Sequence, residues 1–382
     1  MLGKIRSKKL KKKSCALRIV IAGGGTGGHL FPGIAIAETF KSKNPETKVL
    51  FISTGNQFEI SALKRTSFEL KKIAVEGIKG RGLRNMARSL SEIPYAIFES
   101  VRILKSFKPD LVIGVGSYSS GPVAIGAWLM GCKIVLHEQN ILPGTTNRIL
   151  SHFADRIYVS FKNSFSKSAS GKVLVAGNPV RQKFLKYLGK SDAEGSFDLK
   201  SKRPFVVLIA GGSQGAQSIN LAVMDALAHI KDKDNLFFVH QTGHNYEKEV
   251  KNIYIKNGVL NCVKPFFYDM EKQYAAADLV ICRAGATTIA EVTALGKGAI
   301  FIPYPFAADN HQVLNAKALV DADAAEMILQ KDLSGKQLAD RIEYYSSNRK
   351  ALLLMAFNAK SFGRPDASKI IVDDCCQLLH RG

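Results

Sequence analysis

The 382-residue chain is long enough for two domains of ordinary size, each with its own core. Its 46% hydrophobic content and mean hydropathy of 0.00 are typical of a folded globular protein and exclude a disordered or membrane-spanning chain. The net charge of +22 and the pI near 9.7 predict attraction to polyanions, either nucleic acid or an anionic membrane surface.

The chain begins with a basic tail, residues 1–16, in which seven Lys and Arg residues fall within the first thirteen positions. We expect no cleavable signal peptide, because Arg18 interrupts the apolar run that follows the tail. No stretch has the roughly 18 apolar residues that a spanning helix needs. The six cysteines show no C-x-x-C spacing, which favours reduced thiols in a cytoplasmic protein.

The first predicted unit is a strand, a glycine-rich turn and a helix. Arg18–Ala22 is short, apolar and β-branched, as in a buried strand. Gly23–Gly28 form a turn whose backbone can approach a ligand closely, and Ile34–Phe40 has helical apolar spacing. The free N–H groups of a helix N-terminus at this turn would suit an anion, or charge that develops in a reaction.

A dinucleotide site is the first alternative, because the glycines of Gly23–Gly28 fit G-x-G-x-x-G. Such a site needs a carboxylate at the tip of the second strand to bind the ribose. Here the predicted second strand, Val49–Ile52, runs into Ser53, and no carboxylate occurs before Glu59. The pattern therefore disfavours a nicotinamide or flavin cofactor. A packing turn without any ligand is a further alternative.

Strand-like runs then alternate with helical ones, which predicts a doubly wound parallel sheet. The predicted strands are Val49–Ile52, Leu111–Val115, Lys133–His137, Arg156–Val159 and Lys172–Ala176. Ligands bind at the carboxyl ends of the strands in such sheets. The loops Gly114–Gly121, His137–Asn147 and Gly177–Arg181 should therefore face the same cleft as the first glycine turn.

The second half repeats this theme after a polar connection, Gly189–Lys202. Pro204–Gly215 predicts a strand and a glycine turn, and Ala216–Ala228 predicts a helix. Further strands are predicted at Leu236–His240, Leu279–Cys282 and Ala299–Pro303. We expect two facing α/β domains, residues 17–178 and 179–364, and a C-terminal helix, 365–380, that packs back on the first.

Glu291 is the first acidic candidate for a ligand role. It lies six residues beyond Gly285, inside the helix that the turn Arg283–Gly285 begins. A carboxylate there can accept both hydroxyls of a ribose while the helix N-terminus meets the phosphates. The alternative is a solvent-exposed helical glutamate without a ligand.

Seven motifs occur in one order along the chain. They are GGGTGGHLFPG at Gly23, VGSYSSGP at Val115, HEQN at His137, GNPVR at Gly177, GGSQGA at Gly211, CRAGATTIAE at Cys282 and ADNHQ at Ala308. With them the chain, from Leu17 to about Leu379, closely resembles the bacterial MurG family. These enzymes move N-acetylglucosamine from UDP-GlcNAc onto undecaprenyl-pyrophosphoryl-muramoyl-pentapeptide, converting lipid I into lipid II in peptidoglycan synthesis. The resemblance implies the GT-B architecture, two Rossmann-like doubly wound domains that face a central cleft.

The resemblance also implies roles for individual residues, with His29 as the candidate catalytic base. The residues expected to line the donor cleft or contact the donor are Thr26, Gly27, Gly28, Asn140 and Arg181. Ser213 would hydrogen-bond the diphosphate, the backbone of Phe267 would contact uracil, and Gln312 would bind sugar hydroxyls. The residues expected to wrap the phosphates and the ribose are Ala286, Thr287, Thr288, Ile289, Ala290 and Glu291. The chain departs from the family pattern at Ala284, where many relatives have Ser, and at His311, where another Gln can occur.

The implied reaction is attack of the muramoyl C4 hydroxyl on the anomeric carbon, with inversion and departure of UDP. It needs a base, for which the unperturbed pKa of a histidine such as His29 is suitable, and positive charge at the leaving diphosphate. The alternative for His29 is a structural imidazole. We expect no metal site and no cofactor, because the literal Asp-x-Asp matches Asp232–Asp234 and Asp321–Asp323 are typical of solvated turns.

Three rival functions stay open at this point. A UDP-GlcNAc epimerase would use the same donor cleft without a lipid acceptor, and a glycolipid synthase would transfer to diacylglycerol instead. A nucleic-acid-binding protein would explain the charge, but no aromatic-interleaved basic motif occurs, so we expect no nucleic acid partner. The expected partners are UDP-GlcNAc, lipid I, an anionic membrane surface and other cell-wall synthesis proteins.

The stretch Gly77–Lys108 mixes large apolar residues with cations, as an interfacial contact with anionic lipid requires. With the basic tail, it predicts a peripheral protein on the cytoplasmic face of the cell inner membrane. The alternative is that the apolar residues are core and the charges a solvated helix face.

Overall fold

The computed structural model of the chain describes residues 16–75, 83–162, 164–165, 171–188, 203–212 and 214–380, with the backbone alone for 83–91. Several predicted features lie outside the described residues. They are the basic tail up to residue 15, the start of the stretch Gly77–Lys108, the connection Gly189–Lys202 and Ser213.

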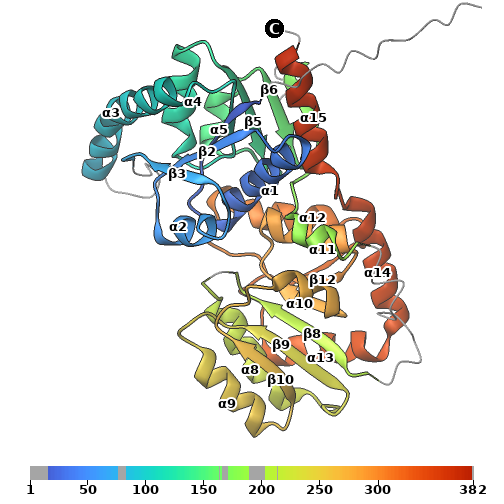
Figure 1. Cartoon of the computed structure of the whole chain (residues 1–382). Helices are drawn as coiled ribbons and strands as arrows, with labels where there is room; N and C mark the ends of the chain where they lie inside the picture. The colour runs from blue at the N-terminus through green and yellow to red at the C-terminus, as the bar shows by residue number, and fades with distance from the viewer. Residues whose placement is uncertain are drawn as a thin grey trace, which may run out of the picture.

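The first half of the chain forms a seven-stranded parallel sheet in the order β3-β2-β1-β4-β5-β6-β7 (Figure 1). The strands are β1 (Arg18–Ala22), β2 (Lys48–Ser53), β3 (Glu69–Lys72), β4 (Leu111–Gly114), β5 (Lys133–Glu138), β6 (Arg156–Val159) and β7 (Val173–Val175). Every pair is parallel, which confirms the predicted doubly wound fold.

Both faces of this sheet are buried, because successive side chains of a strand point to opposite faces. In β1, Ile19 and Ile21 pack on one side, and Val20 and Ala22 on the other. The first side is covered by α1 (Gly27–Lys43), α2 (Gln57–Leu63) and the C-terminal α15 (Ala367–His380). The second is covered by α3 (Leu83–Phe107), α4 (Ser120–Leu129) and α5 (Thr145–Leu150).

The second half forms a six-stranded parallel sheet in the order β10-β9-β8-β11-β12-β13. Its strands are β8 (Phe205–Ala210), β9 (Leu236–Gln241), β10 (Leu260–Lys264), β11 (Leu279–Cys282), β12 (Gly298–Phe301) and β13 (Glu326–Met327). One face packs against α8 (Gln217–His229), α9 (Glu247–Lys256) and α13 (Gly335–Ser347). The other packs against α6 (Gln182–Leu185), α10 (Met270–Ala276), α11 (Ala286–Leu295) and α12 (His311–Val320), which follows the short 3-10 helix η2 (Ala308–Asn310).

The C-terminal segment connects the two domains. Helix α14 (Arg349–Phe362) packs on the second domain, and α15 continues from it to lie beside α1 of the first (Figure 1). Ile371, Val372 and Cys375 of α15 are fully buried in the core that β1 and α1 share. The domain limits given above stay predictions.

Three strands had no counterpart in the prediction, and each lies at a sheet edge: β3, β10 and β13. An edge strand with an exposed face lacks the continuous apolar run that marks a central parallel strand. Glu69–Lys72, for example, contains one apolar residue in four. Its sequence therefore gives no strand signal.

The first glycine turn is shorter than predicted, because α1 begins at Gly27 rather than near Ile34. Gly23 has φ +119°, and a Cβ there would collide with the carbonyl oxygen of Gly116, so this position requires glycine. The early start places His29 in the first turn of α1. Gly27 and Gly28, which the sequence predicts to be part of the turn, therefore belong to the helix. Their backbone N–H groups point along the helix axis toward the N-terminus of α1.

Candidate active site

A cleft of about 940 Å³ lies between the two domains, at the carboxyl ends of both sheets. Three strand–loop–helix turns contribute to its lining: Thr26–His29 before and within α1, the loop after β8, and Gly285–Thr288 at the start of α11. Of the three further loops that the sequence predicts to face this cleft, two contribute to its lining, with Gln139 and Asn140 from one and Arg181 from the other, whereas no residue of Gly114–Gly121 lines it.

Most of the predicted site residues line this cleft together. They are Thr26, Gly27, Gly28, His29, Asn140, Arg181, Ala286, Thr287, Thr288, Glu291 and Gln312. Three described residues of the prediction do not line it: Phe267, Ile289 and Ala290.

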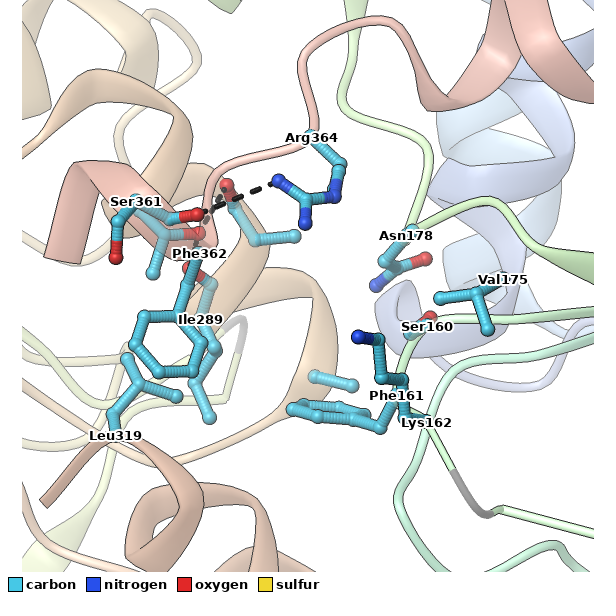
Figure 2. A pocket seen from close by; sticks show the side chains of 14 residues that line it. Ser160, Phe161, Lys162, Val175, Asn178, Ile289, Leu319, Ser361, Phe362 and Arg364 are labelled. Atoms are coloured by element: carbon cyan, nitrogen blue, oxygen red, sulfur yellow. Dashed lines mark hydrogen bonds between the residues drawn. The ribbon is translucent and has the colours of Figure 1, made fainter. Parts of the chain in front are cut away.

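Ile289 and Ala290 lie on the far side of α11. Figure 2 shows the smaller cavity there, about 350 Å³, which these two residues line with Phe362 and Arg364. A helix turns about 100° per residue, so six successive residues cannot all face one ligand. Ala286 at the helix start lines both cavities, whereas Thr287, Thr288 and Glu291 line the main cleft.

Phe267 is buried in the core of the second domain, with 3% of its surface exposed. Its backbone N–H donates to Gln241 Oε1 over 2.9 Å, and Gln241 Nε2 donates to the carbonyl of Gly212 over 2.8 Å. Gln241 therefore ties the segment around Phe267 to the second glycine loop. Contact of this backbone with uracil stays a prediction.

The His29 imidazole is oriented by two oxygens. Its Nδ1 lies 3.0 Å from the Val115 carbonyl oxygen and 3.0 Å from Gln139 Oε1. Both oxygens are acceptors, so Nδ1 carries the proton in the neutral ring and Nε2 keeps its lone pair. A neutral imidazole in this tautomer can accept a proton at Nε2.

The Glu59 carboxylate binds the backbone of the first glycine turn on the side away from the cleft lining. Its side chain is fully buried, and it accepts hydrogen bonds from the N–H groups of Gly25 (2.6 Å) and Asn56 (2.8 Å). A Cβ on Gly24 would collide with this carboxylate. The sequence offered no sign of this role, although Glu59 and Asn56 form a capping box at the start of α2. A carboxylate thus occupies a loop of a kind that often binds phosphate.

Glu138 organises the loop that carries Asn140. This buried carboxylate accepts hydrogen bonds from the backbone of Asn140 (3.0 Å) and Gly144 (3.1 Å) and from Asn147 Nδ2 (2.8 Å). Asn315 of α12 reaches across from the second domain and donates to Asn140 Oδ1 over 3.0 Å. The position of Asn140 therefore depends on both domains.

Arg181 and Glu291, both expected to contact the donor, also bind each other. Arg181 Nη2 lies 2.7 Å from Glu291 Oε1, and its guanidinium stacks on the Phe31 ring of the first domain at 4.4 Å. Burial raises the pKa of the Glu291 carboxyl, and the Arg181 cation acts in the opposite direction. Arg181 thus connects the ribose candidate to the first domain.

A further interdomain contact follows from Pro32. Proline has no N–H, so within α1 it leaves the carbonyl of Gly28, four residues earlier, without its helical partner. The Thr287 hydroxyl of α11 donates to that carbonyl over 3.0 Å. The starts of α1 and α11 therefore meet at the cleft.

Arg283 is a site residue that the sequence analysis did not assign. It lines the cleft, and its guanidinium donates to the carbonyls of Ile302 and Pro303 and to the side chains of Ser218 and Gln330, over 2.8 to 3.2 Å. These acceptors are all neutral, and within the described part of the chain no carboxylate pairs with it. Burial lowers its pKa. A rigid cation without a counter-charge is suited to an anionic ligand.

Gln312 holds the loop after β12, whose Tyr304 lies beside Arg283. Its Oε1 accepts the backbone N–H of Tyr304 over 2.9 Å, and the Tyr304 ring lies 5.5 Å from the Arg283 guanidinium. Contact of Gln312 with sugar hydroxyls stays a prediction.

The two Asp-x-Asp matches, Asp232–Asp234 and Asp321–Asp323, do not line the cleft, and their four aspartates are exposed.

Among the described residues, no group of three or more His, Cys, Asp or Glu side chains could bind a metal ion. In the same part of the chain, every helix is too short or too polar to cross a membrane.

Comparison with known families matches both halves of the chain to one class of enzyme. The N-terminal domain of glycosyltransferase family 28 matches residues 19–159, and the C-terminal domain of that family matches residues 206–371. These matches cover most of both sheets, whereas β7 and Arg181 lie between the two matched ranges.

Similar proteins share nearly the full length. A "UDP-N-acetylglucosamine--N-acetylmuramyl-(pentapeptide) pyrophosphoryl-undecaprenol N-acetylglucosamine transferase" of Syntrophus aciditrophicus is 46% identical over 364 residues, 95% of this chain and 99% of that protein. A protein of the same name from Myxococcus xanthus is 42% identical, over 95% of this chain and 93% of its own.

The crystal structure of Acinetobacter baumannii MurG is similar to the whole fold. Its TM-score is 0.75 at 30% sequence identity, and the match covers 96% of this chain and 100% of that one. The cleft, its glycine turns and these likenesses together lead to one conclusion: the chain belongs to the MurG family of UDP-N-acetylglucosamine-dependent glycosyltransferases.

Proposed function

We propose that this chain transfers N-acetylglucosamine from UDP-GlcNAc to the C4 hydroxyl of the muramoyl sugar of lipid I, inverting the anomeric carbon and releasing UDP. The observation that carries the proposal is the lining of one interdomain cleft. It combines the His29 imidazole of the first domain with the Arg283 guanidinium and the α11 N-terminus of the second. An inverting transfer needs a base for the incoming hydroxyl and positive charge for the leaving diphosphate.

His29 Nε2 takes the proton of the acceptor hydroxyl as its oxygen forms a bond to the anomeric carbon. The bond between that carbon and the diphosphate oxygen breaks at the same time, and its electron pair leaves with UDP. In the imidazolium, Nδ1–H still donates to Val115 and Gln139, so both oxygens stabilise the new positive charge.

Arg283 and the first turn of α11 receive the leaving diphosphate. Hydrogen bonds to neutral acceptors already hold the Arg283 guanidinium in place. Little reorganisation is therefore needed as negative charge develops on the phosphate. Ser213 lies in the neighbouring glycine loop, outside the described residues, and its hydrogen bond to the diphosphate stays part of this proposal.

The decisive assay mixes the purified chain with radiolabelled UDP-GlcNAc and lipid I. We expect label in lipid II and release of UDP. The same reaction without lipid I distinguishes an epimerase, which would convert UDP-GlcNAc alone, and diacylglycerol in place of lipid I tests the glycolipid synthase. Conversion without lipid I, or transfer to diacylglycerol only, would contradict the proposal.

The proposed chemistry needs no divalent ion, because fixed cationic and helix N-terminal groups face the diphosphate. Activity should therefore survive EDTA, with the acceptor dispersed in detergent so that magnesium has no effect on the lipid. Loss of activity that only a divalent ion restores, together with its loss in an Asp232 or Asp321 variant, would favour a metal mechanism.

We further propose that the first domain docks on the cytoplasmic face of the inner membrane, where the anchored acceptor lies. Large apolar side chains are exposed on three of its helices that pack together, α3, α4 and α5. They are Tyr95, Phe98, Trp128, Leu129 and Ile149, with 51 to 68% of their surface exposed. The cations Arg102, Lys105 and Arg148 are exposed on the same helices and suit anionic lipid.

The stretch named in the sequence analysis divides between surface and core. Tyr95 and Phe98 are exposed, whereas Ile103 and Phe107 pack against the core of the first domain. Phe107 also lies under the Arg18 guanidinium at 4.9 Å. Ile103 and Phe107 of the predicted lipid contact therefore belong to the domain core. Trp128 and Leu129 of α4 instead add exposed apolar side chains to the proposed membrane surface.

Sedimentation with liposomes tests the docking. Phe98→Ser with Trp128→Ser should weaken binding about 10-fold or more, since each buried aromatic contributes roughly 1.5 to 3 kcal/mol. Phe357→Ser is the matched control, because Phe357 is 74% exposed on α14 of the second domain. Binding that ignores anionic lipid content, salt and the double substitution would rule out this surface.

A further inference from the structure

A chain of hydrogen bonds leads from the cleft into the first domain behind His29. His29 Nδ1 lies 3.0 Å from Gln139 Oε1, and Gln139 Nε2 lies 3.0 Å from Nδ1 of His137. His137 Nε2 in turn lies 3.2 Å from the carbonyl oxygen of Gly177. These three side chains, with the Gly177 carbonyl at the end, form a hydrogen-bond relay.

The direction of each bond in the relay is set by backbone carbonyls. Gln139 Nε2 is 2.8 Å from the Val115 carbonyl oxygen, so the amide must present its NH₂ group there. The reversed amide would bring two oxygens together at that distance. Gln139 Oε1 therefore faces His29 and can only accept, which requires the proton on His29 Nδ1.

His137 fixes the other end of the relay. Its Nε2–H donates to the Gly177 carbonyl, so its Nδ1 has a free lone pair that accepts from Gln139 Nε2. The ring is fully buried, and this desolvation lowers its pKa to about 4. His137 thus stays neutral near pH 7 and cannot reverse the Gln139 amide by becoming a second donor.

The fold supplies this geometry at one edge of the sheet. His137 belongs to β5 and Gln139 follows it, Val115 directly follows β4, and Gly177 comes two residues after β7. Carboxyl ends of parallel strands meet at the same edge, so these groups converge although they lie far apart in sequence. Gly177 has φ +90°, a conformation that suits glycine and directs this carbonyl.

We propose that Gln139 and His137 are positioning residues that set the tautomer of His29, leaving the lone pair of its Nε2 available in the cleft. This inference rests on the proposed role of His29 as the base. The backbone carbonyls of Val115 and Gly177 determine the proton positions of all three side chains. Without Gln139, the Val115 carbonyl alone accepts from His29 Nδ1, so the preference for this tautomer weakens and the fraction of rings able to accept at Nε2 falls.

The first experiment observes the tautomer directly and needs no substrate. The full chain is labelled with ¹⁵N-histidine, and the His29 signals are assigned by their loss in His29→Ala. In the neutral His29 ring, we expect Nδ1 to be the protonated nitrogen and Nε2 the unprotonated one. In Gln139→Met, which keeps the side-chain length and removes both polar atoms, this preference should weaken, because the Val115 carbonyl alone then accepts from Nδ1.

A wild-type His29 that carries its proton on Nε2 would overturn the proposal whatever the kinetics show. So would Gln139→Met with the wild-type tautomer. His137→Phe provides the second variant, because it removes the acceptor for Gln139 while the Val115 carbonyl remains. It should disturb the tautomer less than Gln139→Met does.

The second experiment separates positioning from substrate binding. Gln139→Met should lower kcat about 3- to 10-fold, as the fraction of rings in the competent tautomer falls, with KM for UDP-GlcNAc within about 2-fold. His137→Phe should lower kcat less. In the His29→Ala background, Gln139→Met should have no further effect, because it acts only through that imidazole. Thermal unfolding of each variant checks that it folds.

An equal fall of kcat on both backgrounds would show that Gln139 acts otherwise and would overturn the proposal. Failure of the His29 role has a different signature. In that case His29→Ala turns over normally, while the labelled wild type still shows the proton on Nδ1.

Discussion

Two strand–loop–helix units face each other across the cleft, β1 to α1 in the first domain and β11 to α11 in the second. In the first, the Glu59 carboxylate accepts the Gly25 N–H, so the turn already contains an anionic group. In the second, Arg283 lies directly after β11 and contacts only neutral acceptors among the described residues. The same backbone unit thus presents a neutral base, His29, on one side and a cation on the other.

The comparison shows that a glycine turn before a helix fixes a place for chemistry but not its kind. Both helices offer N–H groups at their N-termini. The side chains that reach the turn from elsewhere decide whether an anion binds there.

Removing the cation of the second unit should have the largest effect. Arg283→Met keeps an unbranched apolar side chain and removes the charge that faces the leaving diphosphate. We expect kcat to fall roughly 10² to 10³-fold, the range found when one preorganised electrostatic group is lost. Steady-state kinetics measure it. A variant with kcat near wild type would mean that Arg283 only braces the loop after β12.

Removing the base of the first unit should have the next largest effect. His29→Ala is expected to lower turnover by about 10²-fold while UDP affinity stays near wild type, because the imidazole acts on the acceptor hydroxyl. Kinetics and UDP titration together check this split. Normal turnover would assign His29 a structural role in the first turn of α1.

The ribose contact of the second unit should contribute less. Glu291→Ala removes the proposed acceptor of the ribose hydroxyls and should weaken UDP binding by about 1 to 3 kcal/mol, because polar partners stay unpaired in the cleft. Titration with UDP and with 2′,3′-dideoxy-UDP measures the loss. The variant should discriminate between the two ligands less than wild type, and unchanged discrimination would contradict the assignment.

A pH effect on stability should be the smallest, and it concerns one buried histidine in each domain. Burial lowers the pKa of His137 to about 4 and that of His240 to about 3, from 6.5. The unfolded chain therefore binds more protons below pH 6.5, so this stability is present above 6.5 and is lost as pH falls toward 4. Urea unfolding at pH 7 and pH 5 should differ by about 1 to 2 kcal/mol for each histidine.

His240→Phe separates the domains in this measurement. His240 hydrogen-bonds Tyr254 and Asn220 at 3.2 and 3.0 Å, so the substitution costs stability at every pH and also removes one titrating group. The difference between pH 7 and pH 5 should shrink in this variant. An unchanged difference would exclude His240 as a source of the effect.

The pattern of residues along the chain was enough to predict the two-domain α/β fold and the central strands, whereas most of the cleft residues were implied by the family resemblance. The reason is local: apolar runs mark strands buried on both faces, and glycines mark turns where the backbone must approach other groups. Ile289 and Ala290 show the limit of motif reading. They belong to the motif that wraps the donor in the prediction, but helical rotation turns them to the smaller cavity.

Tertiary packing determines which distant side chains form hydrogen bonds with the residues of the glycine turns and of α1. Glu59 reaches Gly25 across 34 positions, Gln139 reaches His29 across 110, and Thr287 reaches Gly28 across 259. Each pair joins different elements, so its geometry depends on how sheets and domains pack and not on residue spacing. Hydrogen bonds are short and directional, and their partners are therefore fixed only when the packed backbone brings the atoms within about 3 Å.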